Sequence, residues 1–260
     1  MKMIENKIFN QYYTKPKLAE KLVKDLDFDR YDYIIEPSAG ECSFYSLLPE
    51  DKRIGIDLCP KCDGLIEADF LDWKEPFVDS DRVLSIGNPP FGRNSSLAIK
   101  FINKCAKWSQ TIAFIVPKSF KKRSMYDKIN LNFWKVKEVD TPKNSFVFNG
   151  KNYDVPCVWL ILEKQEDKRT KEIKLKPPAN FTFTSKENSN CCFRRVGINA
   201  GFSSVDIEVA EPSHYFINAI DPSDFVERMN KIKWNHNNTL GPRSISKNEL
   251  IEAYNKTLIT

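Results

Sequence analysis

Five short apolar runs follow one another through the first half of the chain, and they constrain its fold more than any other feature. Each run ends beside a glycine, a proline or an acidic residue, which is typical of buried strands followed by turns. Apolar residues at helical spacing near 18–23 and 95–108 indicate intervening helices. We therefore expect an α/β fold with a largely parallel sheet, built from residues 31–35, 53–56, 65–70, 83–86 and 111–116.

The fourth run stops at Gly87, and Asn88-Pro89-Pro90-Phe91 follows it. Two consecutive prolines exclude both a helix and ladder pairing, so this stretch is held rigidly beyond a strand end. Open α/β sheets bind their ligands at that position. The amide oxygen of Asn88 and nearby backbone carbonyls, beside the flat ring of Phe91, suit a planar group that carries an NH2. The alternative is a turn with a buried phenylalanine.

Three earlier strand ends also carry polar groups. The turn from Glu36 to Gly40 precedes a predicted helix at 44–48, and Gly40 allows a ligand close to the backbone. Asp57 stands where dinucleotide-type folds place the carboxylate that binds a ribose diol, although a helix cap is the alternative. The pair Asp69-Phe70 has two equally good interpretations. It could bind an adenine ring, or it could form a turn beside a core aromatic.

The order of these four strand ends resembles the S-adenosylmethionine-dependent amino-methyltransferases, above all the N6-adenine methyltransferases. Residues 11–16 (Gln-Tyr-Tyr-Thr-Lys-Pro) and 115–120 (Ile-Val-Pro-Lys-Ser-Phe) are similar to the same family. The similarity covers residues 9 to 162. It implies a Rossmann-like class I methyltransferase sheet and S-adenosyl-L-methionine as cofactor.

The resemblance also implies a role for each matching residue. The cofactor would be held by Tyr13, Thr14, Glu36, Ser38, Gly40, Asp57, Asp69 and Phe70. The target amine would be held within the motif Asn88, Pro89, Pro90 and Phe91, with Phe91 stacked on the target base. Either Phe146 or Phe148 would cover its other face. The family usually has a second glycine where this chain has Cys42, so we expect that side chain to crowd the methionine end of the cofactor.

The distribution of charge favours a nucleic-acid partner. Residues 101–165 carry 12 basic and 5 acidic side chains, whereas residues 1–100 carry 14 and 18. The basic loop residues Lys118, Lys121, Lys122 and Arg123 are predicted phosphate contacts. Arg194 and Arg195 precede a glycine-rich turn, where they either grip phosphates or belong to the turn alone. DNA is the favoured substrate. The alternatives are RNA, a protein glutamine amide, or an inactive module that only binds nucleic acid.

We expect two domains, a methyltransferase domain at 1–165 and a small mixed target-recognition region at 166–260. The sequence contains no run long enough to span a membrane and no signal peptide, so a cytoplasmic location is expected. The seven cysteines should then be reduced thiols. Cys59 and Cys62 have zinc-ligand spacing, but no second C-x-x-C exists, so we expect no metal site.

Overall fold

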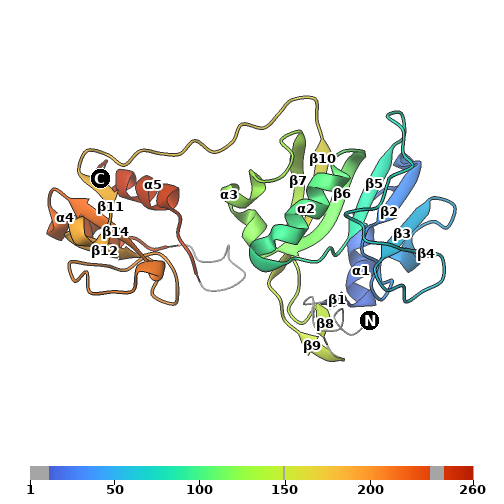
Figure 1. Ribbon diagram of the computed structural model, residues 1–260, viewed down its shortest axis with the longest axis horizontal. Coiled ribbons are helices and arrows are strands. Elements are labelled where there is room, and N and C mark those ends of the chain that lie inside the picture. Colours follow the sequence, from blue (N-terminus) through green and yellow to red (C-terminus); the bar gives the residue numbers. More distant parts are fainter. Residues whose placement is uncertain (1–11, 149, 235–242, 260) are drawn as a thin grey trace. The chain divides into compact units, whose positions relative to one another are not determined.

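The fold is described by a computed structural model, in which residues 12–148, 150–234 and 243–259 are placed (Figure 1). The chain forms two compact units, unit 1 (Met1–Lys171) and unit 2 (Glu172–Thr260). The division falls later than the predicted 165 because the buried guanidinium of Arg169 donates to the carbonyl oxygens of Phe133 (2.7 Å) and Tyr126 (3.1 Å) in unit 1. Within the placed residues, no helix is both long and apolar enough to cross a bilayer.

Unit 1 contains a seven-stranded sheet in the order β4-β3-β2-β5-β6-β10-β7 (Figure 1). The strands from β4 to β6 pair in parallel, while β10 pairs antiparallel with both β6 and β7. This order confirms the predicted α/β fold class with a largely parallel, Rossmann-like sheet. The strands are β2 (Tyr33–Glu36), β3 (Arg53–Asp57), β4 (Leu65–Glu67), β5 (Val83–Gly87), β6 (Ser109–Pro117), β7 (Phe133–Asp140) and β10 (Cys157–Lys164).

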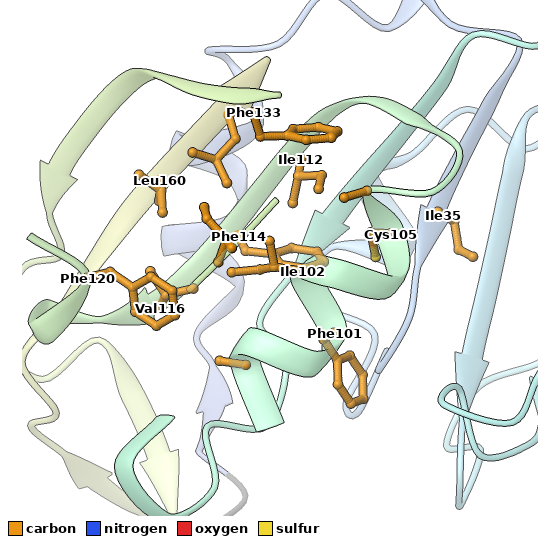
Figure 2. Packing of buried hydrophobic residues seen from close by; sticks show 14 of the residues in the cluster. Ile35, Phe101, Ile102, Cys105, Ile112, Phe114, Val116, Phe120, Phe133 and Leu160 are labelled. Carbon is orange, nitrogen blue, oxygen red and sulfur yellow. The ribbon is translucent and has the colours of Figure 1, made fainter. Parts of the chain in front are cut away.

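The core of unit 1 lies between this sheet and helix α2 (Ser96–Cys105). The apolar runs predict it correctly, because the strands at its centre are buried along most of their length. Figure 2 shows Ile102 and Cys105 of α2 among the side chains of Ile112 and Phe114 on β6. The sheet is therefore a rigid platform, and its strand ends are fixed relative to one another.

The predicted alternation of strands and helices is wrong between β2 and β5. The expected helix at 44–48 is a single 3-10 turn, because Cys42 already has a left-handed backbone (φ 60°) and Pro49 follows closely. No α-helix is placed between β2 and β5, a stretch that the structure describes in full. The helices of unit 1 are α1 (Pro16–Val23), α2 and α3 (Arg123–Tyr126), with 3-10 turns η1 (Phe28–Arg30), η2 (Tyr45–Leu47), η3 (Arg93–Ser95) and η4 (Lys118–Lys121).

A second, three-stranded sheet joins the N-terminal segment to the segment after β7. Its order is β1 (Tyr13–Thr14), β8 (Phe146–Phe148) and β9 (Lys151–Tyr153), all antiparallel (Figure 1). In the register, Thr14 stands opposite Phe146. This pairing fixes where residues 12–14 lie, although they are far in sequence from the strands of the main sheet.

Unit 2 has its own sheet, in the order β11-β14-β12-β13, and its own apolar core. Strand β13 is short, because only Ser203 and Ser204 pair with β12. The chain ends in helix α5, whose start is fixed by a capping box between Ser246 and Glu249. The elements are β11 (Phe181–Thr184), η5 (Lys186–Asn188), β12 (Cys191–Arg194), β13 (Ser203–Ser204), η6 (Glu211–Ser213), β14 (His214–Ala219), α4 (Pro222–Lys231) and α5 (Lys247–Thr257).

Candidate active site

A cavity of about 320 Å³ opens at the carboxyl ends of β2, β3 and β5 in unit 1. Its volume is in the range typical of small-molecule sites, and it lies where the strand order of the sheet reverses. All four predicted strand ends contribute to its wall. The lining includes Tyr12, Tyr13, Thr14, Glu36, Ser38, Gly40, Asp57, Asp69, Phe70, Asn88, Pro89, Pro90, Phe91, Leu97 and Phe101.

Glu36 ends β2 and is almost completely buried, with 2% of its surface exposed. Its Oε2 has no hydrogen-bond partner among the placed residues. Burial raises the pKa of this carboxyl well above its usual range; a hydrogen bond from the Tyr45 backbone acts against the rise, and the charge of Asp57 adds to it. A buried carboxyl with a free oxygen suits a ligand that brings a positive charge or a hydrogen-bond donor.

The turn after β2 and the end of β3 are joined through Asp57. The backbone N–H of Gly40 donates to Asp57 Oδ2 (2.8 Å), and the N–H of Cys59 donates to Oδ1 (2.9 Å). Gly40 has φ +54°, and a Cβ there would lie 3.1 Å from the ring of Tyr13. Position 40 therefore favours glycine. Asp57 is held in place by the two backbone N–H groups, and each of its oxygens keeps a lone pair that can accept a further hydrogen bond.

Cys42 does not crowd the cavity. Its left-handed backbone turns the side chain into a small buried cluster with Ala39 and Tyr45, and its sulfur forms a disulfide with Cys62. The expectation that all seven cysteines are reduced is therefore wrong for this pair, because the turn after β2 brings Cys42 beside the loop after β3. Cys59 is an exposed free thiol, and the placed residues contain no group of three or more metal-ligating side chains.

Asp69 and Phe70 have mainly structural surroundings. Asp69 is exposed, and its Oδ1 accepts a hydrogen bond from the backbone N–H of Leu71 (2.8 Å). Phe70 is 2% exposed and packs against Phe101, with 4.9 Å between the ring centroids. Both rings belong to the core and also line the cavity. The pair therefore forms a turn beside a core aromatic and also lines the cavity, so its role beside an adenine ring stays a prediction.

Asn88 is held by the N-terminal strand. Its Nδ2 donates to the carbonyl oxygen of Tyr12 (2.8 Å) and to Thr14 Oγ1 (3.1 Å). Its Oδ1 is buried and has no partner among the placed residues, and its backbone carbonyl accepts from Ser38 Oγ (3.4 Å). The sequence did not indicate the bond from Asn88 to the carbonyl of Tyr12, since every residue type has a backbone carbonyl. Gln11, from the same predicted segment, lies outside the described residues.

The rest of the motif anchors the start of α2. Phe91 is half-buried and packs against the main core, so one side of its ring is occupied. Its carbonyl accepts hydrogen bonds from the N–H groups of Leu97 (3.1 Å) and Ala98 (3.3 Å). Pro89 is buried and Pro90 is half-buried beside it. The motif is therefore fixed at both ends, by β5 and by α2.

The two aromatic candidates on β8 differ in exposure. Phe146 is fully buried, whereas Phe148 is half-buried. Phe148 belongs to an aromatic cluster with Tyr12 and Tyr153, with ring centroids 5.5 Å and 5.9 Å from its own. Neither phenylalanine lines the cavity itself. Only Phe148 has a ring surface that a ligand could reach without a change in packing.

Two carboxylates lie against the four cations of the predicted basic loop. Lys118 and Lys121 both contact Asp140, at 3.0 Å and 2.7 Å. Burial raises the pKa of Asp140, but the hydrogen bonds from Lys121 and Lys118 outweigh it and hold the pKa below its usual value. Arg123 contacts Asp127 at 2.9 Å, and Lys122 is half-buried beside it. The predicted concentration of positive charge is therefore smaller in the folded chain than in the sequence.

In unit 2, one of the two predicted arginines lies beside an aromatic ring. Arg195 is placed over the ring of Tyr215 (5.3 Å), and Lys247 lies over Phe183 (4.4 Å) and Tyr215 (5.7 Å). The Nε of Arg194 donates to the carbonyl of Val196 (3.3 Å). Arg194 thus takes part in the turn, while Arg195 and Lys247 form a group of cations and aromatic faces with Phe183 and Tyr215, a combination common in nucleic-acid-binding surfaces.

Three solved structures resemble part of this chain. A candidate RNA methyltransferase from Pyrococcus horikoshii is 17% identical, with 60% of this chain and 88% of that chain covered and a TM-score of 0.47. A dimethyladenosine transferase from Plasmodium falciparum is 20% identical, with 60% and 64% covered and a TM-score of 0.42. A type I restriction-modification methyltransferase subunit from Streptococcus thermophilus is 17% identical, with 59% and 45% covered and a TM-score of 0.41.

No family profile and no curated protein matches the sequence. The likeness to the three solved structures is too low in identity and TM-score to bear on what this chain binds. What the site can do therefore depends on its own residues.

Proposed function

We propose that the chain is an S-adenosylmethionine-dependent methyltransferase that methylates the N6 amine of adenine in DNA. The observation that carries the proposal is Asn88. Its amide is fixed by two hydrogen bonds from Nδ2, and its buried Oδ1 has no partner in the described part of the chain. An unsatisfied acceptor at a strand end, beside the ring of Phe91, suits an NH2 on a planar heterocycle.

The cavity fits the proposed cofactor. Asp57 is held rigidly and retains free lone pairs, so it suits the hydroxyls of a ribose. Glu36 is a buried carboxyl with an unpartnered oxygen, and it suits the ammonium group of the methionine part. Gly40 lines the cavity with its backbone, and Phe70 and Phe101 offer an apolar wall for the adenine. When bound, S-adenosylmethionine supplies a methyl group activated by a sulfonium.

The chain's own contribution to the reaction is orientation and electrostatics. Asn88 Oδ1 and the backbone carbonyl of Pro89 would accept hydrogen bonds from the two N–H groups of the target amine. This would direct the lone pair of the amine nitrogen out of conjugation with the ring. Phe91 and Phe148 hold the base between them, and Phe148 is favoured over Phe146 because Phe146 is fully buried. Holding the reactants in one geometry would account for a large part of the rate enhancement, and the proton that the amine loses when the methyl group passes from the sulfonium to nitrogen would go to water.

A base within a duplex must leave the stack before it reaches this site, at a cost of a few kcal/mol. Stacking on aromatic side chains returns roughly 1–3 kcal/mol per base. Phosphate contacts would supply the rest, and unit 2 is the better source of them. The cations of Arg195 and Lys247 in unit 2 lie over aromatic rings, and Arg194 precedes the same turn. Lys118, Lys121 and Arg123 in unit 1 are instead in contact with carboxylates.

The test is transfer of labelled methyl from S-adenosylmethionine by the purified full chain. Duplex DNA, single-stranded DNA and RNA of mixed sequence are offered in parallel, and the nucleosides are separated after digestion. We expect N6-methyladenine in duplex DNA. Asn88→Ala should lower the rate by about 100-fold or more, because the amine loses its acceptor. The matched control is Asn152→Ala, an exposed asparagine on β9.

Other outcomes separate the rival functions. Label in RNA alone moves the substrate to RNA while keeping the chemistry. Label in protein glutamine, with none in nucleic acid, refutes the adenine assignment. Nucleic-acid binding without cofactor binding or turnover identifies an inactive binding module.

A further inference from the structure

The side-chain amide of Asn88 has a single orientation. Its Nδ2 lies 2.8 Å from the carbonyl oxygen of Tyr12 and 3.1 Å from Thr14 Oγ1. A carbonyl oxygen can only accept, so the nitrogen of the amide must face Tyr12. Both N–H bonds are thereby used, and Oδ1 is the atom that stays without a partner in the described structure. Residues 12–14 thus decide which atom of Asn88 faces a target amine.

We infer that Thr14 is a positioning residue for Asn88, and this inference rests on the proposed methyl transfer. Its hydroxyl accepts one N–H of the amide and so prevents the side chain from rotating. The resemblance to known methyltransferases assigns Thr14 to the cofactor instead. The contact with Asn88 gives the same residue a role at the other substrate.

Thr14 is itself held too firmly to drift away from Asn88. It is 7% exposed and stands opposite Phe146 in the β1–β8 pair. Its backbone carbonyl accepts a hydrogen bond from Ser43 Oγ (2.6 Å). These contacts involve the backbone and the buried face of β1, so they survive when only the hydroxyl is removed.

A fixed amide matters because an unpartnered buried oxygen is unfavourable. An amide that could rotate would relieve this by moving Oδ1 toward another donor or toward water. The bonds to Tyr12 and Thr14 prevent that rotation, so a donor on the substrate is the group that satisfies Oδ1. Thr14 therefore acts on catalysis through Asn88, and it need not touch the cofactor to do so.

The first test measures the amide directly and needs no turnover. The full chain is labelled with ¹⁵N-asparagine, and Asn88→Ala identifies the Asn88 side-chain signals by their loss. Thr14→Val removes the hydroxyl and keeps the shape, whereas Thr14→Ser keeps the hydroxyl. We expect the Asn88 NH2 signals to shift in Thr14→Val and to exchange about tenfold faster, with Thr14→Ser close to wild type. Unchanged signals in Thr14→Val would overturn the inference.

The second test separates kcat from cofactor affinity on the substrate that the wild type methylates. We expect Thr14→Val to lower kcat by about 10- to 100-fold, with cofactor Kd unchanged and activity restored by Thr14→Ser. Thermal melting of both variants shows that the fold is intact. A raised cofactor Kd with normal kcat at saturating cofactor would make Thr14 a cofactor contact and refute the positioning role. A wild type that methylates nothing refutes the proposed function, while the spectra still decide how Asn88 is held.

Discussion

Reducing the Cys42–Cys62 disulfide should lower the free energy of unfolding of unit 1 by about 3 kcal/mol. The bond closes a loop of 20 residues that contains all of β3 and the start of the loop after it. In the chain-entropy account, a closed loop of this length removes about that much free energy from the unfolded state. For a unit of this size, the loss corresponds to a fall in Tm of about 6–12 °C.

The assay compares thermal and urea unfolding of the oxidised wild type, the reduced wild type and Cys42→Ala/Cys62→Ala. The matched control is Cys59→Ala, which removes an exposed thiol from the same loop and leaves the disulfide intact. We expect the reduced wild type and the double variant to unfold together, below the oxidised wild type and the control. Thiol titration in denaturant should find five free thiols without reductant and seven with it.

Two results would refute this reasoning. Seven titratable thiols in protein purified without reductant would mean that the bond does not form. Five thiols with no change in Tm on reduction would mean that the bond forms but does not constrain the unfolded chain.

Three further predictions concern single residues. Arg169→Ala should lower the free energy of unfolding of unit 1 by about 3 kcal/mol, because Arg169 is buried and its guanidinium donates to backbone carbonyls of unit 1. The control is Lys168→Ala, which changes an exposed side chain. Equal urea midpoints for the two variants would contradict the argument. Glu36→Gln should gain stability relative to wild type as pH rises above 4.5, the ordinary pKa of a glutamate, because burial raises the pKa of Glu36 and ionisation then favours the unfolded chain. Urea midpoints at about pH 5 and about pH 8 test this, and an identical pH dependence of both proteins would count against it. Gly201→Ala should destabilise unit 2 by about 2 kcal/mol or more, since Gly201 has φ +107° and the new Cβ would lie 2.2 Å from Trp234. Tryptophan emission and a melting curve identical to those of the wild type would contradict this, because they would mean that the loop adapts.

The residues at the carboxyl ends of the parallel strands could be predicted from the sequence. Apolar runs that stop at Gly87 and Asp57 identify buried strands and their last residues, because burial and turn formation depend on local composition. Parallel strands align their carboxyl ends at one edge, so residues at those ends must meet. For that reason Glu36, Asp57 and Asn88 were correctly expected around one cavity.

The partners of those residues were decided by the tertiary structure alone. Nothing local to Asn88 indicates that Tyr12 and Thr14 hold its amide, because that contact exists only through the pairing of β1 with β8. The same applies to Cys42 and Cys62, whose loops meet only after β2 and β3 pair.

Tertiary contacts also decided the net charge of the basic loop and the exposure of the two phenylalanines on β8. The sequence predicts four cations in the basic loop, but Asp140 at the end of β7 forms ion pairs with two of them, Lys118 and Lys121. Phe146 and Phe148 alternate in the sequence, and only the packing of β8 decides that Phe146 is buried. The sequence by itself determined the sheet and the residues at its edge, since these follow from periodicity and turn chemistry. The orientation of an amide, the pairing of thiols and the neutralisation of charges depend on contacts between distant segments, which exist only in the folded chain.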